Sequence, residues 1–309
     1  MKRVFIDGSA GTTGLRIRER LQARDDIALI TLPEELRKDP AARKDALNNC
    51  DAAFLCLPDA AAIEAVSMVE NPDVTILDTS TAHRTDPRFA YGFPELSAAH
   101  LEKVQSTNRI AVPGCHASGF IALIYPLIEA GLLSPEEKLA FFSLTGYSGG
   151  GKAMIAQYQD ENRDPLLGAP RQYALGQTHK HLKEMAAVTG LKNFPIFSPI
   201  VADFYSGMEV SVPLFASQVK ATLKQIKELY ADKYNTPMVR FAEDSSESGF
   251  LSAGKLSGLD CMELSVDGND ERILLTARYD NLGKGASGAA IECMNLRFGL
   301  NPTEGLKVE

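Results

Sequence analysis

The sequence lacks a long apolar run, a basic cluster and any cysteine spacing typical of a metal site. No apolar stretch approaches the ~20 residues that cross a bilayer, so a membrane helix is not expected. The net charge is −8 at pH 7, and without a basic patch neither nucleic acid nor an anionic membrane is expected as a partner. No secretory signal pattern precedes the first strand pattern, so we expect a cytoplasmic protein.

The five cysteines are odd in number and scattered along the chain, which is typical of free thiols in a reducing compartment. Their spacing offers no set of metal ligands, so no metal site is expected. Four of them lie in apolar strand or helix patterns and are expected to be packing residues: Cys50, Cys56, Cys261 and Cys293. Cys115 stands in a different pattern.

The first third of the chain alternates strand patterns with helical patterns, and a length of 309 residues favours two domains. Strands are expected at residues 4–7, 27–32, 52–57, 74–78 and 109–112. Helices are expected at residues 11–23, 40–48 and 60–69, with Asp59 capping the last of them. This alternation predicts an α/β domain with a Rossmann-type, doubly wound parallel sheet.

After Cys115, strand patterns follow one another with few helices between them. Strands are expected at residues 138–145, 195–201, 209–215, 238–241, 262–266 and 273–279. Helical patterns cover residues 182–188, 218–234 and 285–298. This order predicts a second, α+β domain built on a mostly antiparallel sheet.

A glycine-rich turn directly follows the first strand and reads Gly8, Ser9, Ala10, Gly11, Thr12, Thr13 and Gly14. Its glycines would let the backbone approach a pyrophosphate, which would then face the N-terminus of the next helix. Its place between strand and helix favours a dinucleotide turn over an ordinary tight turn. Past the second strand, Arg37 and Lys38 favour NADP, whereas Glu34 would suit NAD.

Cys115 lies between a strand, a Pro-Gly turn and a helical pattern. That order places the thiol in the first turn of a helix, where free N–H groups and the helix dipole favour an anion. The thiol should therefore ionise more easily than one with the ordinary pKa of about 8.5. Together with a nucleotide turn, this indicates covalent catalysis coupled to hydride transfer; the alternative is a buried structural cysteine.

Histidines near Cys115 are the candidate acid/base groups. His116 is adjacent, but neighbouring helical side chains point about 100° apart, which makes it a poor partner. His179 and His181, with Glu184 shortly after, offer a general acid/base and an orienting carboxylate. The alternative is a solvated polar turn before a helix. Within the pair we expect His179 to move the proton.

Three further segments have two interpretations each. The glycine-rich run at residues 146–152 can hold an anion with its N–H groups, or it can be a flexible hairpin loop. Arg84, past the end of a strand, can pair with a carboxylate or phosphate, or it can be a surface arginine. Asn281 can bind a carboxamide such as nicotinamide, or it can serve only the geometry of its turn.

These stretches together resemble the N-acetyl-γ-glutamyl-phosphate reductases, and most of all their short form. The resemblance runs from Gly8 to Gly288 and is most specific in Pro113-Gly114-Cys115 and in residues 280–286. Val112 stands where the long form usually has asparagine, and residues 199–201 read Pro-Ile-Val where it has Pro-His-Leu. The family shares its fold and chemistry with aspartate-semialdehyde and glyceraldehyde-phosphate dehydrogenases.

The resemblance implies a role for each candidate residue. Cys115 would be the nucleophile, and His179, His181 and Glu184 would match the family's His-x-His-x-x-Glu stretch. The turn Gly8 to Gly14, Ser80 and Asn281 would contact NADP. Arg84, Ser148 and Gly149 would lie against the substrate. The last helix would return to the first domain, giving an NADP-binding domain of residues 1–114 and 283–309 and a catalytic and oligomerisation domain of residues 115–282.

The expected reaction is the NADPH-dependent reduction of N-acetyl-γ-glutamyl phosphate to N-acetylglutamate semialdehyde, with release of phosphate. It would proceed through a cysteine thioester and belong to arginine biosynthesis, in a homo-oligomer that is a dimer or tetramer. The enzymatic alternatives are an aspartate-semialdehyde dehydrogenase and a thioester-forming aldehyde dehydrogenase. The alternative from another class is a nucleotide-sensing regulator without turnover.

Overall fold

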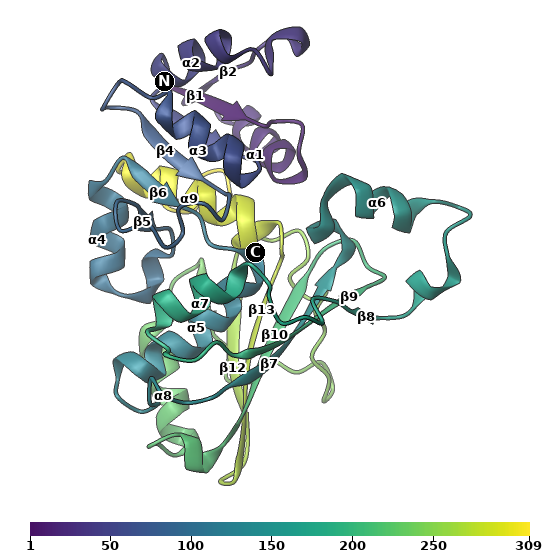
Figure 1. Ribbon diagram of the computed structural model, residues 1–309. Coiled ribbons are helices and arrows are strands. Elements are labelled where there is room, and N and C mark those ends of the chain that lie inside the picture. The colour runs from purple at the N-terminus through teal and green to yellow at the C-terminus, as the bar shows by residue number, and fades with distance from the viewer. The chain divides into compact units, whose positions relative to one another are not determined.

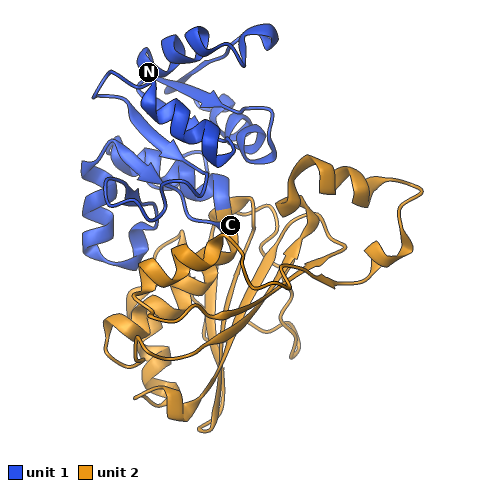
Figure 2. Ribbon diagram, in the orientation of Figure 1, with its two compact units in different colours: residues 1–114, 286–306 blue, residues 115–285, 307–309 orange.

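The computed structural model describes residues 1–309, which form two compact units (Figure 2). Unit 1 contains residues 1–114 and 286–306, and unit 2 contains residues 115–285 and 307–309. The first unit is therefore discontinuous. Its second segment begins at Ala286 rather than at residue 283, because the Asp280 carbonyl accepts hydrogen bonds from the N–H groups of Gly283 and Gly285 and holds this turn in unit 2.

Unit 1 is a six-stranded sheet in the order β2-β1-β3-β4-β6-β5, with every strand pair parallel. Its strands are β1 Lys2–Asp7, β2 Ile27–Ile30, β3 Ala52–Leu55, β4 Thr75–Asp78, β5 Ala90–Tyr91 and β6 Arg109–Ala111. Its helices are α1 Thr12–Gln22, α2 Pro40–Asn48, α3 Asp59–Ser67, α4 Ala98–Ser106 and α9 Gly288–Arg297. The doubly wound parallel sheet is confirmed.

The two faces of this sheet bury separate apolar cores. Val4 and Ile6 point into one core, which contains residues of α1 and α9, whereas Phe5 points into the other, which contains residues of α2 and α3. Successive side chains of a strand alternate between faces, so helices on both sides are needed to cover it. The helix expected after residue 284 begins with a π-helical turn, Gly283–Ser287, before α9.

The cap of α3 differs from the expectation. Pro58, with extended backbone angles, is the N-cap residue, and no side chain caps the helix. Asp59 is the first helical residue, and its carboxylate accepts a hydrogen bond of 2.9 Å from the N–H of Thr81. The prediction that Asp59 caps this helix is therefore wrong, because its side chain binds the loop after β4 instead.

Unit 2 is a seven-stranded sheet in the order β11-β12-β13-β10-β7-β9-β8 (Figure 1). Only the pairs β11–β12 and β7–β9 are parallel, which confirms a mostly antiparallel sheet. The strands are β7 Ala140–Gly146, β8 Arg171–Gln172, β9 Ile196–Ala202, β10 Met208–Phe215, β11 Val239–Phe241, β12 Met262–Gly268 and β13 Arg272–Tyr279.

Helices α5 Cys115–Glu129, α7 His181–Thr189 and α8 Leu223–Lys233 lie on one side of this sheet (Figure 1). Helix α6, Gly151–Gln159, belongs to an excursion between β7 and β8. Helix α8 is shorter than the expected 218–234, because the Thr222 hydroxyl accepts from the Gln225 N–H and starts the helix there. Gln218 lies in a preceding 3-10 turn.

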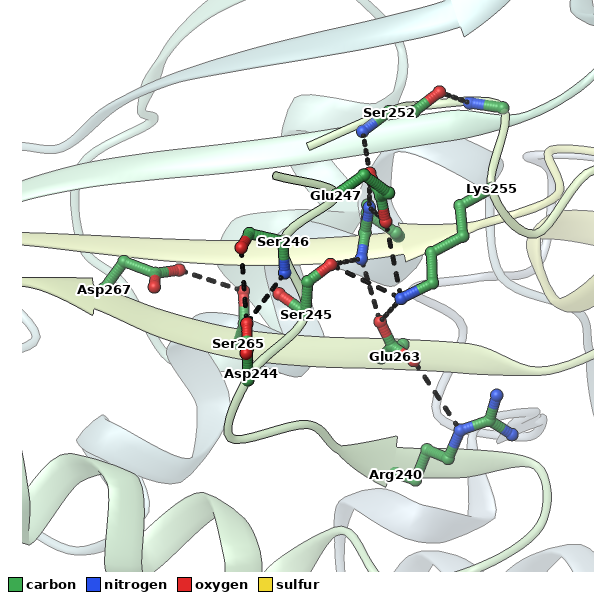
Figure 3. Close-up of polar contacts among 12 residues, drawn as sticks. Arg240, Asp244, Ser245, Ser246, Glu247, Ser252, Lys255, Glu263, Ser265 and Asp267 are labelled. Atoms are coloured by element: carbon green, nitrogen blue, oxygen red, sulfur yellow. Dashed lines mark hydrogen bonds and ion pairs between the residues drawn. The ribbon is translucent and has the colours of Figure 1, made fainter. Parts of the chain in front are cut away.

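The other face of the unit 2 sheet is partly covered by the loop at residues 242–259. Arg278, which is 2% exposed, forms ion pairs with Glu247 of this loop and Glu263 of β12. Lys255 of the loop and Arg240 of β11 also reach Glu263 (Figure 3). The loop is therefore fixed to β12 and β13 by a chain of charged side chains.

No cysteine forms a disulfide, and Cys50, Cys261 and Cys293 are buried. Burial raises the pKa of the Cys50 and Cys56 thiols to about 12, so both stay protonated, as packing residues should. None of the helices is both long and apolar enough to cross a membrane.

Candidate active site

Cys115 is the first residue of α5, and three residues, Val112, Pro113 and Gly114, separate it from the end of β6. Its side chain is half-buried. The first N–H groups of a helix have no partner within it, so they and the helix dipole can stabilise a thiolate here. The predicted position of this thiol in the first turn of a helix is confirmed.

Three histidines gather beside α5. Helix α7, which packs against α5, begins at His181, and His179 lies in the turn just before it. The ring centroids of His179 and His181 are 4.6 Å apart, and each lies within 5.8 Å of the centroid of His116. The pair is thus part of a packed cluster, and the alternative of a solvated polar turn is wrong.

His116 occupies the buried centre of this cluster. Its Nδ1 lies 2.6 Å from Ser143 Oγ, and its Nε2 lies 2.7 Å from Tyr173 Oη. Burial, followed by the charge of His179, lowers the pKa of His116 to about 3. The imidazole is therefore neutral at pH 7, and each of its ring nitrogens lies within hydrogen-bond distance of a hydroxyl.

Tyr173 is a site residue that the sequence did not reveal. Its ring centroid lies 6.3 Å from that of His179, and burial, followed by the charge of Cys115, raises the pKa of its phenol. It lies just after β8, and His116 Nε2 holds its hydroxyl. No local pattern marks this position, because its neighbours His116 of α5 and Pro199 of β9 are distant in sequence.

His181 and Glu184 are the buried polar residues of the stretch from His179 to Glu184. They are 6% and 2% exposed and stand three residues apart on α7, a spacing that puts them on one side of the helix. His179 is half-buried, and its Nδ1 accepts the N–H of His181 at 3.2 Å. Accepting that bond leaves Nε2 as the protonated nitrogen of a neutral His179 ring.

Asn281 is buried, and its amide holds the turn after β7. Its Nδ2 donates to Ser148 Oγ at 3.0 Å, and its Oδ1 accepts from the Gly207 N–H at 3.0 Å. Residues Tyr147–Gly150 form a 3-10 turn that leads into α6, so the flexible-hairpin interpretation is wrong. Gly149 is exposed in this turn. The structure thus favours the turn-building role of Asn281.

The glycine-rich turn of unit 1 borders a cavity of about 640 Å³. Gly8, with φ of +85°, leaves no room for a side chain, because a Cβ there would lie 2.2 Å from the Cys56 carbonyl oxygen. Gly14 is equally constrained, with a Cβ position 2.5 Å from the Gly8 carbonyl oxygen. These contacts bring α1 close to the ends of the strands, as a phosphate-binding turn requires.

Three cations without an ion-pair partner line the same cavity. Arg37 and Lys38 follow the second strand, and Arg18 comes from α1. Arg43 also lines it, but its guanidinium pairs with Asp7 and Glu64. Arg18 was missed by sequence reasoning, because it lies in an ordinary helical pattern with no motif. The cavity lining therefore carries three cations without an ion-pair partner, next to the carboxylates of Glu34 and Glu35.

Ser80 and Arg84 lie in the loop after β4. The Ser80 hydroxyl donates to Asp78 Oδ2 at 2.8 Å. Arg84 is buried, and its Nε and Nη2 donate to the carbonyls of Val112 and Thr79, each at 2.9 Å. The surface-arginine interpretation is therefore wrong: Arg84 fixes the segment that leads to Cys115.

The domains of this chain match two family models. Residues 9–104 match the NAD binding domain of semialdehyde dehydrogenase, and residues 115–281 match its dimerisation domain. Aspartate semialdehyde dehydrogenase II of Vibrio cholerae, solved in complex with ASA, has a TM-score of 0.71 at 14% identity and covers 97% of this chain and 98% of its own. The enzyme of Candida albicans, solved with NADP, has a TM-score of 0.64 at 14% identity, covering 96% and 98%. Fold and domains define an oxidoreductase of the semialdehyde dehydrogenase class.

Relatives with higher sequence identity show which family within this class the chain belongs to. The N-acetyl-gamma-glutamyl-phosphate reductase of Sinorhizobium medicae is 44% identical over 303 residues, covering 95% of this chain and 98% of the relative. That of Brucella ovis is 44% identical over 307 residues, covering 96% and 99%. The chain belongs to the N-acetyl-gamma-glutamyl-phosphate reductase family and is an oxidoreductase that uses a nicotinamide cofactor.

Proposed function

We propose that this enzyme reduces N-acetyl-γ-glutamyl phosphate to N-acetylglutamate semialdehyde with NADPH, releasing phosphate, in arginine biosynthesis. The relatives at 44% identity support the substrate. The observation that carries the chemistry is the half-buried Cys115 at the start of α5, beside the histidine cluster. The test is NADPH oxidation with this acyl phosphate and with β-aspartyl phosphate; faster turnover of the latter would contradict the proposed substrate.

Each residue has a task in the proposed reaction. An imidazole of His179 or His181 takes the Cys115 proton, and the thiolate attacks the acyl carbon, whose bond to the phosphate oxygen then breaks. The phosphate leaves with that electron pair and a solvent proton, and a thioester remains on Cys115. A nicotinamide cofactor, when bound, would supply the hydride that reduces the thioester carbonyl. The imidazolium protonates the resulting oxyanion, and the thiohemiacetal then returns its proton, expels the thiolate and gives the aldehyde.

We propose NADP as the cofactor because basic side chains line the cavity beside the glycine-rich turn of unit 1. The 2′-phosphate that distinguishes NADP from NAD is a dianion, and Arg18, Arg37 and Lys38 are cations without an ion-pair partner. Glu34 and Glu35 also line the cavity, so the cations must outweigh two carboxylates. The three basic side chains come from two elements, which is the arrangement that can enclose a phosphate.

Replacing Arg18, Arg37 or Lys38 singly by alanine is expected to raise the KM for NADPH roughly 10- to 100-fold, because each removes a charge-assisted contact worth about 1.5–3 kcal/mol. The KM for NADH should stay within about twofold. The measurement is kcat and KM for both cofactors at one ionic strength. The control is Lys44→Ala, an exposed cation of unit 1 that pairs with Glu70 and does not line the cavity. Equal effects on NADPH and NADH would contradict the assignment.

We also propose a dimer formed through the open face of the unit 2 sheet. Phe142, Ile196 and Phe215 are 48%, 61% and 65% exposed. Their strand neighbours Phe141, Phe197 and Leu214 are buried, so the exposed side chains point to the face opposite the helices. The match to a dimerisation domain supports a second copy of this chain as the occupant.

Phe142→Asp is expected to convert the dimer to a monomer, because a charge in a buried sheet interface lacks a partner. Light scattering during size-exclusion chromatography measures the mass. Leu166→Asp is the control, because Leu166 is 71% exposed in a 3-10 turn away from the sheet. A Phe142→Asp protein that keeps the wild-type mass would exclude this face as the interface.

A further inference from the structure

A tyrosine hydroxyl forms hydrogen bonds with two backbone groups in the first turn of α5. Tyr279, the last residue of β13, donates its hydroxyl proton to the Cys115 carbonyl at an O···O distance of 2.6 Å. The same oxygen accepts the N–H of Gly119 at 3.0 Å. Cys115 and Gly119 are four residues apart, so the hydroxyl joins the two ends of the turn that carries the thiol.

Gly119 makes this contact possible. A Cβ at this position would lie 2.7 Å from Tyr279 Oη and 2.7 Å from Val210 Cγ2, closer than side-chain atoms approach one another. Glycine weakens a helix interior relative to alanine, so its presence here needs a reason from packing. The close approach of the phenol to the helix backbone supplies that reason.

The phenol of Tyr279 stays protonated and can therefore donate a hydrogen bond. Its side chain is fully buried, and burial, followed by the charge of Cys115, raises the pKa of its phenol well above the ordinary value. A phenol that stays protonated can always donate to the Cys115 carbonyl. Gly285 packs closely against both residues: a Cβ there would lie 3.2 Å from Cys115 Cβ and 3.3 Å from the Tyr279 ring, so these neighbours would have to shift.

We propose that Tyr279 is a positioning residue for the nucleophile: its hydroxyl fixes the backbone of Cys115 and thereby the direction of the thiol. This proposal rests on the proposed role of Cys115. Helix ends fray, and a nucleophile at the first helical residue needs an anchor. Attack on an acyl carbon requires reacting atoms about 3–3.5 Å apart, and a misplacement of about 1 Å can cost 100-fold.

The same helix offers a matched control. Tyr234, which is 1% exposed, donates its hydroxyl to the Ala122 carbonyl at 2.8 Å. Pro126 has no N–H, so Ala122 lacks its helical donor and Tyr234 replaces it. Tyr234→Phe therefore removes a buried hydroxyl from the backbone of α5, as Tyr279→Phe does, but two turns away from Cys115.

The test compares Tyr279→Phe with Tyr234→Phe. Both lose a buried hydrogen bond and should unfold at a somewhat lower temperature. Only Tyr279→Phe should lower kcat, by roughly 10- to 100-fold, with the Kd of NADPH unchanged. It should also slow the burst of phosphate that acylation of Cys115 releases when the enzyme meets acyl phosphate without NADPH.

Each outcome decides a separate point. If Tyr279→Phe keeps kcat and the phosphate burst within twofold of the wild type, Tyr279 does not position the thiol. If Tyr234→Phe loses as much activity, the effect is general destabilisation, and the proposal is again wrong. Cys115→Ala tests the underlying function, because a phosphate burst in that variant would exclude Cys115 as the nucleophile whatever Tyr279 does.

Discussion

Cys115→Ser is expected to abolish turnover, by several orders of magnitude, while the Kd of NADPH stays within about twofold. A serine hydroxyl does not ionise at neutral pH, whereas a thiol at a helix N-terminus can. NADPH binding should survive, because the cavity and the glycine-rich turn belong to unit 1, whereas Cys115 belongs to unit 2. The measurements are NADPH oxidation with the acyl phosphate and a fluorescence titration with NADPH.

Cys50→Ser is the control for this substitution. Cys50 is buried in unit 1, where burial raises the pKa of its thiol to about 12, so it contributes packing and no nucleophile. The variant should be less stable, yet its folded fraction should turn over at the wild-type rate. Turnover by Cys115→Ser above a hundredth of the wild-type rate would contradict the nucleophile assignment.

The fold was largely predictable because its signals are local. The buried strand β3, Ala52–Leu55, is a continuous apolar run, as a strand covered on both faces must be. In unit 2, strands such as β10 alternate between buried and more exposed residues, which indicates a sheet with one covered face. Two errors lie at element ends, where Asp59 and the start of α8 depend on side-chain hydrogen bonds that periodicity does not show. The short strands β5 and β8 and the helices α4 and α6 were not predicted.

The site was only partly predictable. The place of Cys115 follows from a Pro-Gly turn within three residues of it, so sequence alone sufficed. Tyr173, Arg18 and Tyr279 came from no motif, because each takes its role from residues far away in the chain that folding brings beside it. The burial of Arg84 was missed for the same reason, because its partner Val112 is distant in sequence.

After Cys115, the largest loss of kcat is expected from replacing one of the paired histidines, His179 and His181. His181→Asn should lower kcat by about 10²- to 10⁴-fold, the usual contribution of a general acid/base, and remove one limb of the pH–rate profile. The structure moves our expectation from His179 to His181, because His181 is buried and Glu184 stands on the same side of α7 as an orienting carboxylate. His179→Asn should cost less than tenfold.

The comparison needs one more histidine as a control. His100→Asn changes an imidazole of α4 in unit 1, whose Nδ1 lies 2.8 Å from Ser97 Oγ, and should leave kcat and both limbs unchanged. His116 is not proposed as the acid, because burial lowers the pKa of its imidazole, which is neutral at pH 7, and its two ring nitrogens contact the hydroxyls of Ser143 and Tyr173. A larger loss in His179→Asn would reverse the order within the pair, and normal kcat with unchanged limbs in both variants would exclude the pair as the acid/base.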